Sequence, residues 1–247
     1  MSLRLVCATP LSPKAFLQES LLGRCLTSTF RDVSLTLHLF PHNTEPLARC
    51  YNSVIFQAGG GPDDTLVFLH DDLCILDLFW TETLDAGLRR FDLVGLAGNT
   101  RRLPRQPAWA FVDTSWAWDE DHLSGAVAHG AQLPLRLKRY GAPLQECKLL
   151  DGVLLAARRS VFLDHGLRFD ERFAFHFYDM DLCREFEAKG LRMGTVPLSA
   201  AHGSAGRFGA PEWRAAYRAY LEKWGEPMAD AQAWASPNSA ISPVSPA

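Results

Sequence analysis

The sequence has no long uncharged run and no segment with the features of a leader. None of its 247 residues lies in an apolar stretch long enough to cross a bilayer. The N-terminus begins with the strand-like segment 3–8, without the basic region and apolar core of a signal peptide. These absences predict a cytoplasmic protein without a transmembrane segment.

The chain also has no charge excess and no cysteine motif. The formal net charge is −3, which gives no electrostatic reason to expect nucleic acid as the main ligand. The six cysteines are scattered and form no Cys-x-x-Cys pair. Most lie in apolar runs, which favours buried free thiols in a reducing compartment over disulfides or a zinc site. Short basic pairs such as Arg158-Arg159 indicate solvated surface positions.

The pattern that is present alternates strands and helices. Hydrophobic residues make up 47% and charged residues 21% of the chain, which is typical of a soluble globular protein. Apolar runs indicate strands at 3–8, 35–40, 66–70, 92–96, 146–149, 152–157 and 191–197, and helical spacing indicates helices at 12–27, 44–58 and 81–90. The alternation predicts an α/β fold with a mixed, mainly parallel sheet flanked by helices, in a single domain over residues 1–235.

Local signals refine this outline. Ser12-Pro13 is typical of a helix start, and Thr44 is the expected cap of the second helix. The stretch 99–143, rich in Pro, Arg and Trp, predicts excursions and short antiparallel strands. Residues 236–247 predict a flexible tail. Aromatic residues at helical spacing within 213–224 indicate either core packing or a homodimer contact.

The most informative segment runs from Leu66 to Asp72. Its apolar residues predict a buried strand that ends on His70, Asp71 and Asp72. Acids at the carboxyl edge of a parallel sheet lie where open α/β folds bind ligands. Asp72 and its neighbours are therefore candidates to hold a divalent cation, which in turn would hold a diphosphate. Solvated acids at a strand end explain the triplet alone equally well.

Two later segments carry further candidate groups. A helical pattern begins at Asp179, so Asp179 and Asp181 lie at a first turn, where acids favour the helix dipole. Asp181 is expected mainly to cap or orient. Aromatic neighbours of Asp179 would desolvate its carboxylate, which suits general-base work near neutral pH. His202 follows a strand in a glycine-rich, flexible loop, as a ligand for a metal held by Asp72 or as an exposed loop histidine.

These motifs, taken in order, resemble a known family. They are His-Asp-Asp at 70–72, Leu-Asp-Gly-Val at 150–153, Phe-Asp-Glu-Arg-Phe at 169–173, Tyr-Asp-Met-Asp at 178–181 and His-Gly-Ser at 202–204. The set is similar to family 2 glycosyltransferases of GT-A fold, in the glycosyltransferase-like branch typified by streptomycin-biosynthesis proteins. The resemblance covers roughly residues 3–205 and implies a GT-A-like, Rossmann-like domain.

The resemblance implies a role for each matching position. Asp72 stands at the last acid of the Asp-x-Asp-type motif that binds Mn²⁺ or Mg²⁺, and His202 matches a late metal-ligand histidine. Asp179 matches the usual catalytic base, although Tyr178 replaces the acid that precedes it in relatives. The positions implied to contact the nucleotide sugar are Thr9, Pro10, Asn43, Asn52, His70, Asp71, Asp151 and Gly152. A helix-surface amide explains Asn52 equally well.

The implied reaction is metal-dependent sugar transfer from a nucleotide-diphosphate sugar to a hydroxyl of a saccharide or other acceptor. A divalent ion would stabilise the anionic leaving group, and Asp179 would take the proton of the attacking hydroxyl. A single base opposite the leaving group predicts inversion. Peripheral contact with a lipid-linked acceptor stays compatible with the sequence. The tryptophans of 99–143 would stack on sugars or pack, and packing is expected for two of these three: Trp109, Trp116 and Trp118.

Two other functions stay open on the sequence alone. A nucleotide-sugar hydrolase or pyrophosphatase would use the same carboxylates to activate water. A non-catalytic nucleotide-sugar-binding partner protein would explain why Tyr178 and His70 stand where relatives carry acids. Dependence of sugar release on an added acceptor separates transfer from hydrolysis, and binding without turnover identifies the partner protein.

Overall fold

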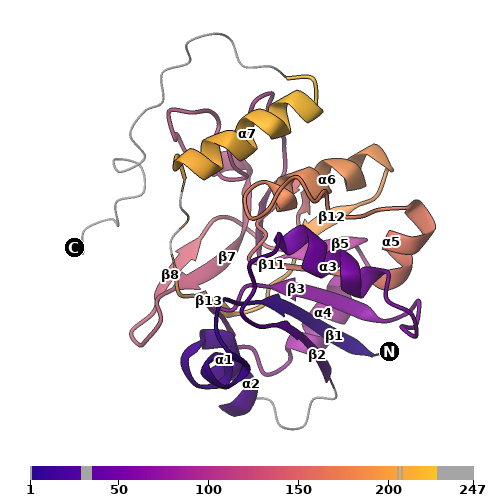
Figure 1. The fold of residues 1–247 in the computed structure, drawn as a ribbon. Coiled ribbons are helices and arrows are strands. Elements are labelled where there is room, and N and C mark those ends of the chain that lie inside the picture. The colour runs from indigo at the N-terminus through magenta and orange to yellow at the C-terminus, as the bar shows by residue number, and fades with distance from the viewer. Residues whose placement is uncertain (1, 29–34, 205, 207, 227–247) are drawn as a thin grey trace.

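A seven-stranded mixed sheet forms the centre of the molecule (Figure 1). The computed structural model describes residues 2–28, 35–204, 206 and 208–226. In spatial order the strands are β2 (Leu35–Phe40), β1 (Leu3–Ala8), β3 (Thr65–Leu69), β11 (Leu154–Arg158), β5 (Leu93–Gly95), β12 (Met193–Thr195) and β9 (Glu146–Cys147). β1 is parallel to β2 and β3, and β12 is parallel to β5. β11 lies antiparallel between β3 and β5, so the expected mixed α/β fold is confirmed with its parallel strands in two groups.

A second sheet adjoins the first. Its strands are β10 (Leu149–Leu150), β6 (Ala97–Asn99), β7 (Leu123–His129), β13 (Ala200–His202) and β4 (Leu73–Ile75), with β8 (Arg136–Arg139) also paired to β7. β7 and β8 are the antiparallel strands expected within 99–143. β3 belongs to the first sheet and β4 to the second, and only residues 70–72 separate them along the chain. The His-Asp-Asp triplet is therefore one of the places where the chain passes from one sheet to the other.

Helices surround the sheets. They are α1 (Pro13–Glu19), α2 (Leu21–Ser28), α3 (Leu47–Ile55), α4 (Trp80–Leu88), α5 (Arg159–His165), α6 (Tyr178–Ala188) and α7 (Pro211–Lys223), with a short 3₁₀ turn at Glu120–His122. Figure 1 shows α7 at one end of the molecule, next to α6, and α1 and α2 at the opposite end. Within the described parts of the chain, every helix is too short or too polar to span a bilayer. The expected tail at 236–247 lies outside the described residues.

The first expected helix, 12–27, is wrong as one element, because Ser20 divides it. Ser20 has an extended backbone, and its Oγ accepts a hydrogen bond from the Gly23 N–H at 2.8 Å, which caps α2. A Cβ on Gly23 would overlap the Phe16 carbonyl of α1. The serine cap and the close approach at glycine together explain why two short helices pack here instead of one long one.

The expected Thr44 cap is also wrong. α3 begins at Leu47, directly after Pro46, and no side chain caps it. Instead, the Leu47 N–H donates to the Ala174 carbonyl at 2.8 Å. A backbone group distant in the sequence therefore satisfies the helix start, which no local pattern indicates.

Arg159 is buried, which corrects its expected surface position. Its guanidinium donates to the carbonyls of Ile55 and Gln57 at 2.7 Å each, and to that of Gly60. These carbonyls follow the end of α3, where helical partners are missing. The arginine thus serves as the C-terminal cap of a helix about 100 residues away.

The aromatic stripe of α7 belongs to the core. Its members are Trp213, Tyr217, Tyr220 and Leu221, each exposed by 3% or less. This favours core packing over a homodimer contact for these side chains. Trp109 and Trp116 are buried and Trp118 is half-buried. This agrees with the expectation that two of the three tryptophans pack in the core.

Candidate active site

The triplet between the sheets places Asp72 beside two imidazoles. His202 Nε2 lies 3.2 Å from Asp72 Oδ1, and His70 Nδ1 lies 4.0 Å from the same oxygen. One potential ligand atom from each residue lies within 4.8 Å of the others. All three side chains are half-buried. The structure therefore brings together Asp72 and His202, which are 130 positions apart in the sequence, and adds His70 to them.

His202 is held by strand pairing on both sides. It pairs with Leu73 of β4 in antiparallel register and with His129 of β7 in parallel register. The flexible loop expected around His202 is wrong for the histidine itself, which is the last residue of β13. Gly203 follows, and its N–H donates to the Asp72 carbonyl at 2.9 Å. Because β4 starts one residue after Asp72, the β4–β13 pairing fixes the distance between the carboxylate and the imidazole.

The environment tunes Asp72 and His202 in opposite directions. Burial raises the pKa of Asp72, but hydrogen bonds from His202 and Ser204 outweigh burial and hold that pKa well below its usual range. Burial lowers the pKa of His202, but the Asp72 hydrogen bond and charge raise it above the ordinary value. The carboxylate is therefore ionised at neutral pH and available as an oxygen ligand.

Tyr178 fixes the tautomer of His70. The Tyr178 hydroxyl donates to the Gly152 carbonyl at 2.7 Å, and it lies 2.9 Å from His70 Nε2. A hydroxyl has one proton, so it accepts at this second contact, and His70 carries its proton on Nε2. The unprotonated Nδ1 then faces Asp72. Burial lowers the pKa of His70 to about 4, which keeps this imidazole neutral. Tyr178 therefore orients the imidazole of His70 toward Asp72.

Asp179 lies across Gly152 from this cluster, at the start of α6. One carboxylate oxygen accepts the Gly152 N–H at 2.9 Å, and the other accepts the Met180 N–H at 2.8 Å. Burial, followed by the charge of Asp151, raises the pKa of Asp179 to about 7, despite these two hydrogen bonds. A carboxyl group with this pKa can gain or lose a proton at neutral pH, as a general base requires.

Two backbone features hold Asp179 and Tyr178 in place. A Cβ on Gly152 would overlap the Tyr178 hydroxyl and crowd the Asp179 side chain, so only glycine fits. Phe177, at the N-cap of α6, has φ 67°, a left-handed conformation that costs a non-glycine residue about 1–3 kcal/mol. Its ring packs on Trp213 and Tyr220 of α7 at centroid distances of 5.1 and 5.2 Å. Core packing by α7 thus maintains the turn that presents Asp179.

Asp151 lies between the two parts of the site. Its carboxylate accepts the Val153 N–H at 3.2 Å and a hydrogen bond from the Trp109 side chain. Burial raises its pKa, and the nearby His202 opposes this shift. Asp151 and Gly152 were predicted to contact the nucleotide sugar. In the structure, Gly152 holds Tyr178 and Asp179 through its backbone, and Asp151 faces His202.

The ends of β1 and β2 lie beside the acidic triplet. The buried Thr9 donates its hydroxyl hydrogen bond to the Asp71 carboxylate, and its carbonyl accepts the Asn43 N–H at 2.9 Å. The Asn43 amide bonds within its own loop, to the Glu45 backbone. Pro10 is exposed. The predicted residues therefore share one edge, although the Thr9 hydroxyl and the Asn43 amide are used to hold it together.

Asn52 lies in a different environment from the one predicted. It is buried in α3, and its amide exchanges two hydrogen bonds of 2.9 Å with the Phe169 backbone. Its nitrogen also lies 3.3 Å from Glu171. These contacts fix the 169–171 segment and leave little capacity for a diphosphate.

Asp181 is fully buried and orients α7, in line with the expectation that it mainly caps or orients. Its carboxylate accepts from Lys223 Nζ at 2.8 Å and from Trp224 Nε1 at 2.9 Å. Lys223 also lies 2.8 Å from Glu185 and 3.1 Å from Asp170. This group ties α7 to α6 directly behind the turn that carries Asp179.

Sequence reasoning missed that Tyr178 and His129 lie beside the candidate site. Tyr178 was interpreted only as a departure from an acid. His129 had a usable signal, because the tripeptide Ala-His-Gly occurs at 128–130 and again at 201–203. The two tripeptides pair in register in neighbouring strands, and the His129 and His202 ring centroids lie 6.3 Å apart.

Three solved structures illustrate what the chain is similar to. GalNAc-T7, solved with UDP, GalNAc and Mn²⁺, matches with a TM-score of 0.55 at 12% identity, over 91% of this chain and 49% of that chain. The chain thus spans about half the length of that protein. A Drosophila beta-1,4-galactosyltransferase 7, solved with manganese, UDP-Gal and xylobiose, gives a TM-score of 0.42 at 11% identity, over 79% of this chain and 65% of that one. The protein A197 from STIV gives 0.45 at 12% identity, over 83% and 87%.

The first of these matches, together with the strand order, confirms a GT-A-like fold in a single α/β domain. The model of the Glycosyltransferase like family matches residues 37–205, which is more than half of the chain. The chain belongs to this family. Comparison with curated proteins gave no significant match.

Proposed function

We propose that the chain transfers a sugar from a nucleotide-diphosphate sugar to an acceptor hydroxyl, with inversion and with the help of a divalent ion. The observation that carries this proposal is the convergence of Asp72, His202 and His70 at one point, with Asp179 across Gly152 from them. Family membership supports it, as do UDP and Mn²⁺ in the structure of GalNAc-T7. The resemblance to the streptomycin-biosynthesis branch is part of the same proposal.

The donor set fits Mn²⁺ better than Mg²⁺. One carboxylate oxygen of Asp72 and two imidazole nitrogens, His202 Nε2 and His70 Nδ1, point toward one another. Mg²⁺ takes oxygen ligands and retains waters, whereas imidazole suits transition metals. When bound, the ion would neutralise the charge of the departing diphosphate. His70, predicted as a nucleotide-sugar contact, is therefore proposed as a third ligand.

Asp179 is the proposed base. Two backbone N–H groups orient its carboxylate, and its raised pKa suits proton transfer from a sugar hydroxyl. Below pH 7 the carboxylate is protonated, so the rate is expected to fall about tenfold per pH unit and to level off above pH 7. A pH profile of transfer at saturating donor measures this. A flat profile between pH 5 and pH 7 would contradict the assignment.

The edge formed by Thr9, Pro10, Asn43 and Asp71 is proposed to receive the nucleoside. It adjoins the metal cluster through the triplet, because Asp71 bonds to Thr9 and directly precedes Asp72. A diphosphate that spans the two places would have its nucleoside at β1 and β2 and its phosphates at Asp72. The donor would then extend from the ends of β1 and β2 toward Asp72.

A thermal-shift panel tests the donor site first. Nucleotides and nucleotide sugars are added with and without Mn²⁺ to wild type, to Asp72→Asn and to the control Asp63→Asn, which changes an exposed acid away from the cluster. Binding to the native state raises the melting temperature by mass action, so one nucleotide sugar should give a shift of a few degrees that requires both Mn²⁺ and Asp72. An equal shift in Asp72→Asn would overturn the metal assignment.

Turnover then separates transfer from hydrolysis. Asp179→Asn is expected to retain the Mn²⁺-dependent nucleotide shift and to lose a factor of about 10²–10⁴ in transfer. Sugar release that requires an added acceptor supports a transferase. Release at the same rate in buffer alone would instead identify a hydrolase, and binding without release would identify a partner protein.

A further inference from the structure

A row of polar side chains begins at the proposed metal site, which is formed by His70, Asp72 and His202. The row crosses three strands. His202 of β13 is in register with His129 of β7, and His129 is in register with Arg136 of β8. Directly opposed residues in neighbouring strands present their side chains on the same face. Neighbouring strands lie about 4.8 Å apart, so the Arg136 backbone is roughly 10 Å from that of His202. The row therefore leads from the proposed metal site to an edge strand.

The same face continues along the hairpin with Lys138 and Tyr140, because alternate residues of a strand share a face. The Tyr140 ring stacks on Trp118 with centroids 6.1 Å apart and an interplanar angle of 23°. Lys138 Nζ lies 4.7 Å from the Trp118 ring centroid, and the Tyr140 hydroxyl lies 3.4 Å from His129 Nε2. Cationic and aromatic side chains thus lie together on this face.

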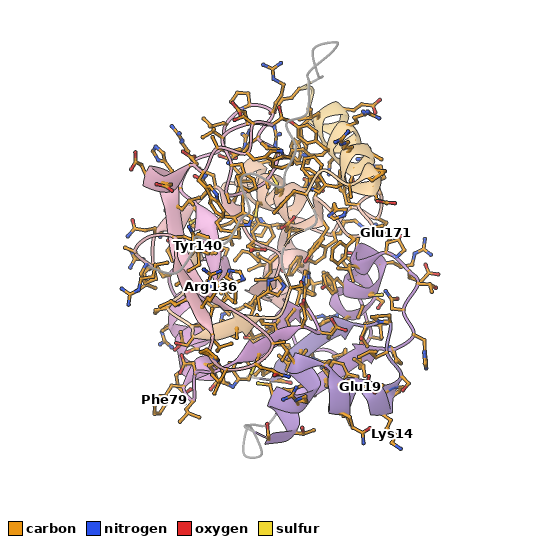
Figure 2. All side chains as sticks on the ribbon, turned by 90° about the vertical axis from the view of Figure 1, so that its left-hand side faces the viewer. Lys14, Glu19, Phe79, Arg136, Tyr140 and Glu171 are labelled. Carbon is orange, nitrogen blue, oxygen red and sulfur yellow. The ribbon has the colours of Figure 1, made fainter. Side chains whose placement is uncertain are left out.

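The outer part of the row is accessible. Arg136 and Lys138 are exposed, and Trp118 and Tyr140 are half-buried. Figure 2 looks onto the side of the molecule that carries β8, and it shows Arg136 and Tyr140 near each other on that side. Among the strands that the structure describes, β8 pairs with β7 alone, and all four of its side chains are exposed.

The charge changes sign along the row. Asp72 and Asp151 stand at the inner end, near His202, and Arg136 and Lys138 stand at the outer end. A ligand with a hydroxyl inward and an anionic group outward matches this distribution, whereas an anion at the inner end would meet the carboxylates. The proposed nucleoside edge is at β1 and β2, outside this row, so a donor bound there would leave the hairpin face to a second ligand.

We propose that this face binds the acceptor, and that the acceptor is an anionic saccharide. Its reacting hydroxyl would point toward Asp179, a sugar ring would lie against the Trp118–Tyr140 pair, and its anionic group would pair with Arg136 and Lys138. The inference rests on the proposed function for the identity of the inner end. It adds the charge of the acceptor and the residues that select it.

The test compares ligands that differ in charge. Titration calorimetry measures binding of p-nitrophenyl β-glucuronide and p-nitrophenyl β-glucoside to the full chain in the presence of Mn²⁺ and UDP. Glucose 6-phosphate and glucose form a second pair, which distinguishes a phosphate from a carboxylate preference. The variants are Arg136→Gln with Lys138→Gln, and the control Arg139→Gln, which removes one positive charge from the opposite face of the same strand.

Wild type is expected to prefer at least one anionic ligand over its neutral partner by about fivefold, and 0.5 M NaCl should reduce the preference. The double variant should bind both members of each pair within twofold, and Arg139→Gln should behave as wild type. Equal binding of both members by wild type, binding of neither, or a preference that survives in the double variant would overturn the inference. Absence of a Mn²⁺-dependent rise in melting temperature with UDP in wild type is a separate result. It would overturn the proposed donor site, and these titrations would still decide the charge preference.

Discussion

Two Ala-His-Gly tripeptides lie side by side in β7 and β13, yet their histidines differ. His202 has the Asp72 carboxylate 3.2 Å away, and its pKa is raised. His129 has Arg136 and Lys138 of β8 beside it. Its pKa is lowered by burial first, and then by the charges of His202 and of these two residues. Sequence and backbone register are the same at both histidines. The neighbouring strand makes the difference, because Asp72 directly precedes β4 and Arg136 and Lys138 lie on β8. His202 is therefore the one of the two histidines that we propose as a metal ligand.

The largest expected effect is a difference in Mn²⁺ affinity between variants of His202 and of His129. His202→Gln should weaken Mn²⁺ binding by about 100-fold, since it removes a direct ligand, whereas His129→Gln should leave Mn²⁺ affinity within about twofold. The measurement is a Mn²⁺ titration followed by electron paramagnetic resonance of the free ion. Similar losses in both variants would mean that the two histidines bind the ion jointly, and the contrast drawn here would be wrong.

A smaller effect on Mn²⁺ affinity is expected when the tyrosine hydroxyl that contacts each imidazole is removed. Tyr178→Phe removes the acceptor of the His70 Nε2–H, so Nδ1 is no longer kept unprotonated and oriented, and Mn²⁺ affinity should fall about tenfold. Tyr140→Phe is the matched control, because its hydroxyl contacts His129 at 3.4 Å. The same Mn²⁺ titration applies. An unchanged affinity in Tyr178→Phe would remove His70 from the ligand set.

The smallest effect concerns stability without metal. The folded pKa of Asp72 lies below its ordinary 3.8 and that of His202 lies above 6.5. The stabilisation by Asp72 is present above pH 3.8 and is lost only as the pH falls through its lower folded pKa. The stabilisation by His202 is present below pH 6.5 and is lost as the pH rises through its higher folded pKa. The ion pair therefore contributes fully between these two values.

Asp72→Asn in metal-free protein should consequently lose more stability at pH 5.5 than at pH 9. The difference is expected to be roughly 1 kcal/mol or less, because the carboxylate is partly exposed to solvent. Denaturant melts in a chelating buffer at the two pH values measure it, with Asp63→Asn as the control. A loss that is the same at both pH values would show that the pair is not ionic in the apo protein.

Much of the fold follows from local pattern. The buried strand before His70, the strand–helix alternation and the helix that begins near Asp179 all appear as predicted, because each depends on the spacing of apolar residues within one short segment. The convergence of Asp72 and His202 came from the ordered motifs rather than from periodicity. The composition of 99–143 also predicted short antiparallel strands there, although not which strands pair with one another.

The features that sequence reasoning missed all depend on partners distant in the chain. The sequence predicts a surface position for Arg159. The residue is buried because three carbonyls at the end of α3 accept hydrogen bonds from its guanidinium. Leu47 begins a helix because Ala174 accepts its N–H. His202 lies in a strand, not a loop, because β4 and β7 pair on its two sides. Tertiary contacts of this kind override local propensity, and a single sequence carries no record of them.

The left-handed turn at Phe177 ties two residues of the candidate site to a helix that lies outside the region matched by the family. The turn presents Tyr178 and Asp179, and α7 holds it through aromatic packing. The family's matched region ends at residue 205, before α7 begins. A substitution in α7 can therefore shift Tyr178 and Asp179 while every residue of the candidate site stays the same.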